Sequence, residues 1–155
     1  MIINLIVLVV SFFGMEFIAW FSHKYIMHGF LWSLHKSHHT KRDGFFELND
    51  VFVIIFASLG LMFIFVLSNV NELFLWSGIG ISLYGIGYFL MHDILVHQRF
   101  KLFRNVKHKY LKSLIRTHKI HHKTISKEGA DAFGFLWVPK RFRKITKSNS
   151  DLLSN

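Results

Sequence analysis

The sequence predicts an all-α integral membrane protein with three or four transmembrane helices. Three observations support this fold class. The 155-residue chain is 52% hydrophobic and yet carries a formal charge of +10, which indicates apolar spans in lipid and charges outside it. Three long apolar runs follow one another along the chain. The only proline is Pro139, so long helices can run without interruption.

The three apolar runs are Ile2 to Phe21, Val51 to Leu67 and Leu73 to Met91, and Glu16 is the only charged residue in them. A spanning helix needs about 20 mostly apolar residues, so all three runs qualify. The alternative is three buried helices of a water-soluble core, but so short a chain could hardly cover them. The apolar stretch from Ala132 to Val138 is far too short for a fourth span. We interpret it as an interfacial segment.

The distribution of charge predicts the orientation in the membrane. Three spans put residues 22–50 and everything after residue 91 on one side. All 19 Lys and Arg residues then fall on that side, which the positive-inside rule makes cytoplasmic. We therefore expect a multi-pass protein of the inner (plasma) membrane. We expect a single membrane-embedded domain over residues 1–145 and a disordered tail over residues 146–155.

Ten of the 11 histidines form a pattern that occurs twice. Each copy is an H-x4-H motif followed by an H-x2-H-H motif. The ten residues are His23, His28, His35, His38, His39, His92, His97, His118, His121 and His122. Each copy follows a span that runs from outside to inside, so both copies should emerge on the cytoplasmic face and meet there. His108 stands outside the pattern and is interpreted as a surface residue.

The spacing of the histidines favours metal binding. The three rings of H-x2-H-H share one helical face and can converge on one point. In H-x4-H, five steps of about 100° leave the rings roughly 140° apart, so the pair flanks a metal from a helix end or the helix bulges there. Ten imidazoles suit two ions of Zn, Cu, Fe or Ni. Interfacial snorkelling or adventitious metal binding would not predict a duplicated spacing.

A few carboxylates are candidates to orient a histidine ring. Glu16 lies inside the first span, seven residues before His23 and on the same helical face. An ionisable group in a span indicates function, and we expect Glu16 to accept a hydrogen bond from a histidine ring rather than to bind the metal directly. Asp93 is expected to play the same part. Asp50 and Glu47 precede the second span, and Glu47 is expected to be solvated at the interface.

These motifs resemble those of the membrane fatty acid hydroxylase superfamily, whose members are non-haem di-iron oxygenases. Within this superfamily, the sequence between the histidines is similar to that of the bacterial β-carotene hydroxylases. The similar stretches are HKYIMHGFLWSLHKSHH (23–39), FFELNDVF (45–52), SLYGIGYFLMHDILVHQRF (82–100), THKIHH (117–122) and FGFLWVP (133–139). The resemblance covers about residues 14–139.

The resemblance implies O2-dependent hydroxylation of carbon 3 on each β-ionone ring of β-carotene, giving zeaxanthin by way of β-cryptoxanthin. It implies two iron ions held by the ten motif histidines, with O2 as co-substrate and electrons from reduced ferredoxin and ultimately NAD(P)H. Zinc can replace iron in a purified sample but cannot change oxidation state. The carotenoid would enter from the bilayer past aromatic residues, or these residues form an interfacial belt. The candidates are Phe30, Trp32, Phe45, Tyr84 and Tyr88.

Two other functions are compatible with the residues themselves. The same metal site could serve a hydroxylase or desaturase of another lipid, such as a fatty acid or sterol. A histidine-rich metal transporter or storage protein is the third hypothesis, but a transporter should carry polar ligands at mid-membrane, and here the histidines lie at span ends. The basic segment Arg99–Lys147 is expected to lie on anionic lipid or to dock an acidic ferredoxin. No nucleic acid partner is expected.

Overall fold

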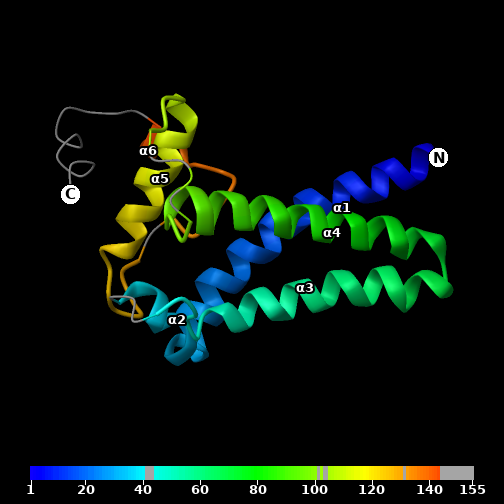
Figure 1. Ribbon diagram of the computed structural model, residues 1–155, viewed down its shortest axis with the longest axis horizontal. Helices are drawn as coiled ribbons and strands as arrows, with labels where there is room; N and C mark the ends of the chain where they lie inside the picture. Colours follow the sequence, from blue (N-terminus) through cyan, green and yellow to red (C-terminus); the bar gives the residue numbers. More distant parts are fainter. Residues whose placement is uncertain (41–43, 101, 103–104, 131, 144–155) are drawn as a thin grey trace.

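The computed structural model describes residues 1–40, 44–100, 102, 105–130 and 132–143, and over these residues the chain is helical without a strand. Three long helices form a bundle (Figure 1), namely α1 (Ile2–Phe21), α3 (Asp50–Phe65) and α4 (Glu72–Phe89). The predicted all-α fold class is confirmed. The predicted tail over 146–155 lies outside the described residues.

The three helices are long and apolar enough to cross a membrane. Together with their helical continuations, the candidate spans are Ile2–Phe30, Asp50–Asn69 and Glu72–Val96. They match the three apolar runs, and the described part of the chain contains no fourth span. Residues 132–138 form a loop instead.

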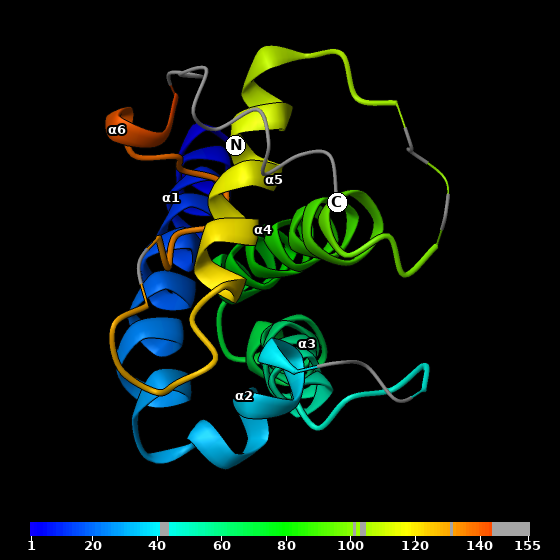
Figure 2. The same ribbon diagram turned by 90° about the vertical axis from the view of Figure 1, so that its left-hand side faces the viewer.

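Both histidine-bearing segments leave the bundle at the same end, as the sequence predicted. α3 and α4 run antiparallel (Figure 1) and are joined through the short helix η2 (Leu67–Asn69). α1 and α3 each pack against α4, and Figure 2 shows the three helices from the end. The N-terminus and the α3–α4 turn lie at one end of the bundle. α2 (Trp32–His39), α5 (Lys109–His122) and α6 (Lys140–Arg143) lie at the other (Figure 1).

The H-x4-H motifs lie in π-helices. α1 continues into η1 (Ser22–Phe30) and α4 into η3 (Leu90–Val96), and both continuations are π-helical. A π-helix bonds residue i to residue i+5, as in the hydrogen bond from the His97 N–H to the His92 carbonyl, 2.9 Å long. Residues five apart therefore lie about one turn apart on one face. The sequence left open whether each H-x4-H pair lies at a helix end or in a helical bulge, and the structure shows the bulge.

Glycines let the neighbouring helices approach α4 closely. A Cβ on Gly80 would lie 2.5 Å from the carbonyl oxygen of Leu8 in α1. A Cβ on Gly78 would lie 2.9 Å from the backbone nitrogen of Ile64 in α3. Both distances are too short for a real side chain, and close approach through small residues is how helices associate in lipid. The two glycines fix the bundle at the end away from the histidines.

Replacing Gly80 with alanine is expected to lower the free energy of unfolding by about 1–3 kcal/mol, because the new methyl group must push the backbone of α1 away. The measurement is the thermal midpoint of the purified protein in detergent. Gly14→Ala in α1 is the matched control, since a Cβ there meets no atom within 4 Å. Equal midpoints for the two variants would contradict the close α1–α4 contact.

Candidate metal centre

The motif histidines form two adjacent groups at the α2–α5 end of the bundle. Within each group, one ligand atom from every residue lies within 4.8 Å of all the others. The first group consists of His23, His28, His35, His39 and His121, and the second of His38, His92, His97 and His118. His122 lies between the groups, with its Nε2 2.8 Å from that of His118 and its ring stacked on His39.

The second group presents nitrogen lone pairs that face each other. The Nδ1 atoms of His38 and His92 lie 2.9 Å and 3.2 Å from carboxylate oxygens of Glu47 and Asp93. A carboxylate only accepts, so each Nδ1 carries the proton and each Nε2 carries a lone pair. These two Nε2 atoms are 2.9 Å apart. Two lone pairs at this distance repel each other unless a cation lies between them.

The first group repeats this arrangement with neutral acceptors. The Nδ1 atoms of His23 and His39 donate to the carbonyl oxygens of Phe133 and Thr124, at 3.0 Å and 2.8 Å. Their Nε2 lone pairs both face the Nε2 of His35, each at 3.1 Å. Converging imidazole nitrogens, each held by an acceptor behind the ring, are typical of a transition-metal site. The donor set of both groups therefore fits metal ions.

Burial keeps the histidines in the neutral form that binds metals. Desolvation lowers the pKa of His35 from its ordinary value of 6.5 to about 3, with the Asn49 side chain acting in the opposite sense. The pKa of His39 falls to about 4 and that of His122 to about 2, again mainly because of burial. At pH 7 these three rings are neutral without a metal.

Acidification is therefore expected to destabilise the metal-free protein. Below pH 6.5 the unfolded chain takes up protons on its histidines, whereas the folded chain cannot until the pH approaches the lowered pKa values. Stability is thus fully present above pH 6.5 and is lost progressively as the pH falls toward 4. Thermal midpoints of the chelator-treated protein in detergent at pH 7.5 and 5.5 test this, and equal values would contradict it.

A buried network of charges stands behind the second group. Arg99 makes two hydrogen bonds to the carboxylate of Asp50, at 2.8 Å and 3.3 Å, and its Nε lies 3.1 Å from Asp93 Oδ1. Asp93 contacts a histidine ring as the sequence predicted. The prediction for Glu47 was wrong, because its side chain is only 10% exposed and accepts from His38. Sequence reasoning missed Arg99, although it lies two residues beyond a motif histidine.

Backbone carbonyls and one side-chain amide accept hydrogen bonds from the Nδ1 atoms of the first group. The carbonyl oxygen of Lys127 accepts from His28 Nδ1 at 3.1 Å, and the Asn49 side chain accepts from His35 Nδ1 at 2.7 Å. The loop that follows α5 thus supplies three carbonyl acceptors. A carbonyl is present at every residue, so no residue type in the sequence could have identified these partners. Asn49 could have been suspected only from its place before the second span.

Glu16 has different partners from the ones that the sequence suggested. Its Oε2 accepts from the hydroxyl of Tyr84 at 2.8 Å, and its Oε1 accepts from backbone N–H groups of the 133–138 loop. The prediction that Glu16 accepts from a histidine ring is therefore corrected. Glu16 and His23 both face the 133–138 loop, which covers the helical face that the sequence predicted them to share.

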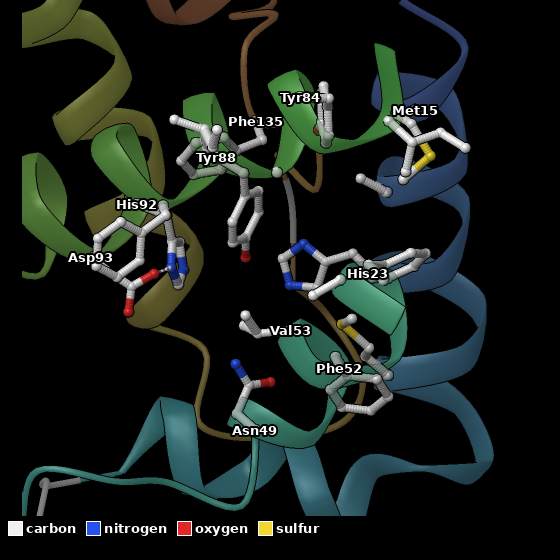
Figure 3. A pocket seen from close by; sticks show the side chains of 18 of the residues that line it. Met15, His23, Asn49, Phe52, Val53, Tyr84, Tyr88, His92, Asp93 and Phe135 are labelled. Carbon is white, nitrogen blue, oxygen red and sulfur yellow. Dashed lines mark hydrogen bonds and ion pairs between the residues drawn. The ribbon is translucent and has the colours of Figure 1, made fainter. Parts of the chain in front are cut away.

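An apolar cavity of about 410 Å³ leads from the membrane-spanning part of the bundle to both histidine groups. Its walls come from α1, α3, α4 and the 133–138 loop, including Met15, Phe56 and Gly85. The rings of His23 and His92 border its inner end (Figure 3). This cavity would admit an apolar group to the space beside the metal centre.

The predicted substrate-binding residues divide into two sets. Tyr84 and Tyr88 line the cavity, and the hydroxyl of Tyr88 points into the space between His23 and His92 (Figure 3). Trp32 packs instead against the first group, with its ring 5.0 Å from the His28 ring. Phe30 and Phe45 are 78% and 48% exposed. These last three do not belong to the cavity wall, and an interfacial position explains them better.

Comparison with known proteins identifies the family. Residues 8–139 match the model of the family described as fatty acid hydroxylase. The chain belongs to the fatty acid hydroxylase family. This match extends from α1 to the end of the 133–138 loop and so includes every histidine of both groups. No solved structure matches the chain.

The chain is also similar in sequence to individual members of this hydroxylase family. The chain is 45% identical to a β-carotene hydroxylase of Pantoea ananas, over 88% of the chain and 78% of the relative. It is 43% identical to a β-carotene hydroxylase of Pseudescherichia vulneris, over 90% of the chain and 80% of the relative. A chloroplastic β-carotene 3-hydroxylase 2 of Arabidopsis thaliana is 37% identical over 85% of the chain, which spans 44% of that protein.

Glu47→Gln is expected to weaken metal binding to the second group by about 10–100-fold. This is the usual loss when the hydrogen-bond partner of a ligand ring is removed. An amide is a poorer acceptor than a carboxylate and no longer favours the Nδ1–H form of His38. The measurement is Co²⁺ titration of the purified protein. The exposed Glu128→Gln is the control, and equal affinities for both variants would contradict a role for Glu47.

Proposed function

We propose that this protein is a β-carotene 3-hydroxylase, a membrane monooxygenase that converts β-carotene to zeaxanthin by way of β-cryptoxanthin. The observation that carries the proposal is the apolar cavity that ends on the imidazoles of both histidine groups. The apolar walls suit a hydrocarbon ring that arrives from the lipid, because the ring passes from one apolar environment to another. The relatives named β-carotene hydroxylase support the choice of substrate.

The proposed cofactor is a pair of iron ions, one held by each histidine group, with His122 available to either. When bound, iron supplies the reductive activation of O2, which no side chain can perform. The overall reaction consumes one C–H bond, O2, two electrons and two protons, and yields the hydroxylated ring and water. We propose a reduced ferredoxin as electron donor, ultimately supplied by NAD(P)H.

The residues of this chain position the reacting ring and keep water away from it. Phe52, Phe56 and Met15 form an apolar wall along the cavity. Tyr88 stacks on His92 with the ring centroids 4.7 Å apart, and Phe135 packs on Tyr88 at 4.5 Å. These contacts hold the imidazole ring still and define the inner end of the cavity. The polyene would lie along α4, where it can remain within the bilayer.

The proposed location is the inner membrane, with the metal centre on the cytoplasmic side. All 19 Lys and Arg residues follow α1 in the chain and none lies in the α3–α4 turn, which is the distribution expected of cytoplasmic segments. Residues 1–145 are proposed to act as one catalytic domain. Exposed lysines of α5, such as Lys112, suit an acidic donor protein.

Expression in bacteria that accumulate β-carotene tests this function. Pigment extracts separated by chromatography should contain zeaxanthin and a smaller amount of β-cryptoxanthin, with O2 and iron required for both. Unchanged β-carotene in cells with adequate iron, oxygen and a working ferredoxin system would refute the substrate assignment. Fatty acid and sterol profiles of the same cells would then reveal whether another lipid is hydroxylated or desaturated.

A further inference from the structure

The carboxylate of Glu16 binds four hydrogen-bond donors from two distant parts of the chain. Its Oε1 accepts the consecutive backbone N–H groups of Phe135, Leu136 and Trp137, at 2.9 Å, 2.9 Å and 3.0 Å. Its Oε2 accepts from the hydroxyl of Tyr84 in α4 at 2.8 Å. One side chain of α1 therefore connects α1, α4 and the 133–138 loop.

These bonds determine the conformation of the loop. Three successive N–H groups that converge on one oxygen form an anion-binding concavity, and hydrogen bonds to a charged acceptor are roughly twice as strong as neutral ones. A Cβ on Gly134 would lie 3.2 Å from the Trp137 carbonyl oxygen and 3.6 Å from Glu16 Oε1. A glycine at this position lets the loop curl around the carboxylate.

The other face of the loop contacts both histidine groups. The carbonyl oxygen of Phe133 accepts from His23 Nδ1 at 3.0 Å, so it fixes the direction of the His23 ring. The ring of Phe133 also packs against His121, at 5.3 Å between centroids. The ring of Phe135 packs against His92, likewise at 5.3 Å. A shift of the loop would therefore disturb ligand rings in the first group and the second.

We propose that Glu16 is a positioning residue of the metal centre, which acts through the 133–138 loop to orient His23 and to hold Phe135 against His92. This inference rests on the metal centre proposed above. Glu16 itself touches no reacting atom in this arrangement. Its described hydrogen bonds go to Tyr84 and to the loop, and the loop in turn contacts the ligand rings.

The loop has a second attachment that does not depend on Glu16. The hydroxyl of Tyr110 in α5 donates to the Leu136 carbonyl oxygen and lies 3.4 Å from the Val138 nitrogen. Phe135 and Val138 also pack with Leu114 of α5 in a small core. Loss of Glu16 should therefore loosen the loop without unfolding the protein.

The test uses the full chain in detergent with three substitutions. Glu16→Leu removes every acceptor, and Glu16→Gln keeps an amide oxygen for the loop and an amide N–H that can donate to Tyr84. Glu72→Leu is the matched control, because Glu72 also joins the same two helices, through a 2.6 Å hydrogen bond from Asn4 at the other end of the bundle. Helix content by circular dichroism identifies variants that remain folded.

Two measurements are needed, and the first does not involve the metal. Hydrogen–deuterium exchange of the amides of residues 135–137 should accelerate about tenfold or more in Glu16→Leu, as the charged acceptor is lost. Co²⁺ affinity should fall about tenfold or more in the same variant, and the Co²⁺ absorption spectrum should change. Glu16→Gln should recover both properties in part, and Glu72→Leu should match the wild type.

Unchanged exchange at residues 135–137, or unchanged Co²⁺ binding in a folded Glu16→Leu variant, would overturn the positioning role. Should Glu16→Leu fail to fold, Glu16→Gln decides the matter, since wild-type values for both measurements would overturn the proposal and intermediate values support it. A wild-type protein that binds no Co²⁺ would instead refute the metal centre itself. The two failures are thus distinguishable.

Discussion

Cells that accumulate β-carotene and carry the His35→Ala variant are expected to retain their β-carotene. His35 is 2% exposed, and its Nε2 lies 3.1 Å from the Nε2 atoms of both His23 and His39. It is therefore the central member of the first group. Removal of a partner behind a ligand costs about 10–100-fold in metal affinity or activity, so removal of the ligand itself should cost about 100-fold or more.

Chromatography of the pigments measures this loss, and metal analysis of the purified variant shows whether the metal is lost with the activity. His108→Ala is the control, because His108 is exposed and lies outside both groups. Zeaxanthin production by His35→Ala close to that of His108→Ala would show that His35 is not a ligand.

Replacement of Gly85 by phenylalanine is expected to block hydroxylation without affecting metal binding. Gly85 lines the cavity, and a Cβ there meets no atom within 4 Å, so a large side chain would extend into the cavity. Gly85 lies seven residues before His92, roughly 10 Å along the helix, where the polyene behind the reacting ring would pass. Activity should fall about 100-fold, the scale of loss when a reacting group is misplaced.

Gly87→Phe is the matched control for this variant. A Cβ on Gly87 also meets no atom within 4 Å, but Gly87 is not part of the cavity wall. Both variants should bind the wild-type amount of Co²⁺, and only Gly85→Phe should lose zeaxanthin formation. Equal activity of the two variants would contradict the assignment of the cavity to the substrate.

The pairing of histidines into groups could not be predicted from the duplicated motif. Each copy of the motif could have formed a group of its own. Instead His121 of the second copy joins the first group and His38 of the first copy joins the second. Because α2 and α5 face each other across the end of the bundle, neighbouring residues on one helix point toward different groups.

The residues alone were enough to predict the three spans, the common side of the two histidine copies and the histidines that gather there. The hydropathy and charge of a segment depend only on its own residues, so these features can be predicted without knowing the fold. The hydrogen-bond partner of each ring and the partners of Glu16 depend on the folded arrangement of the chain. The partners of Glu16 are backbone N–H groups more than a hundred residues away, which every sequence contains, and packing alone brings these particular ones to the carboxylate.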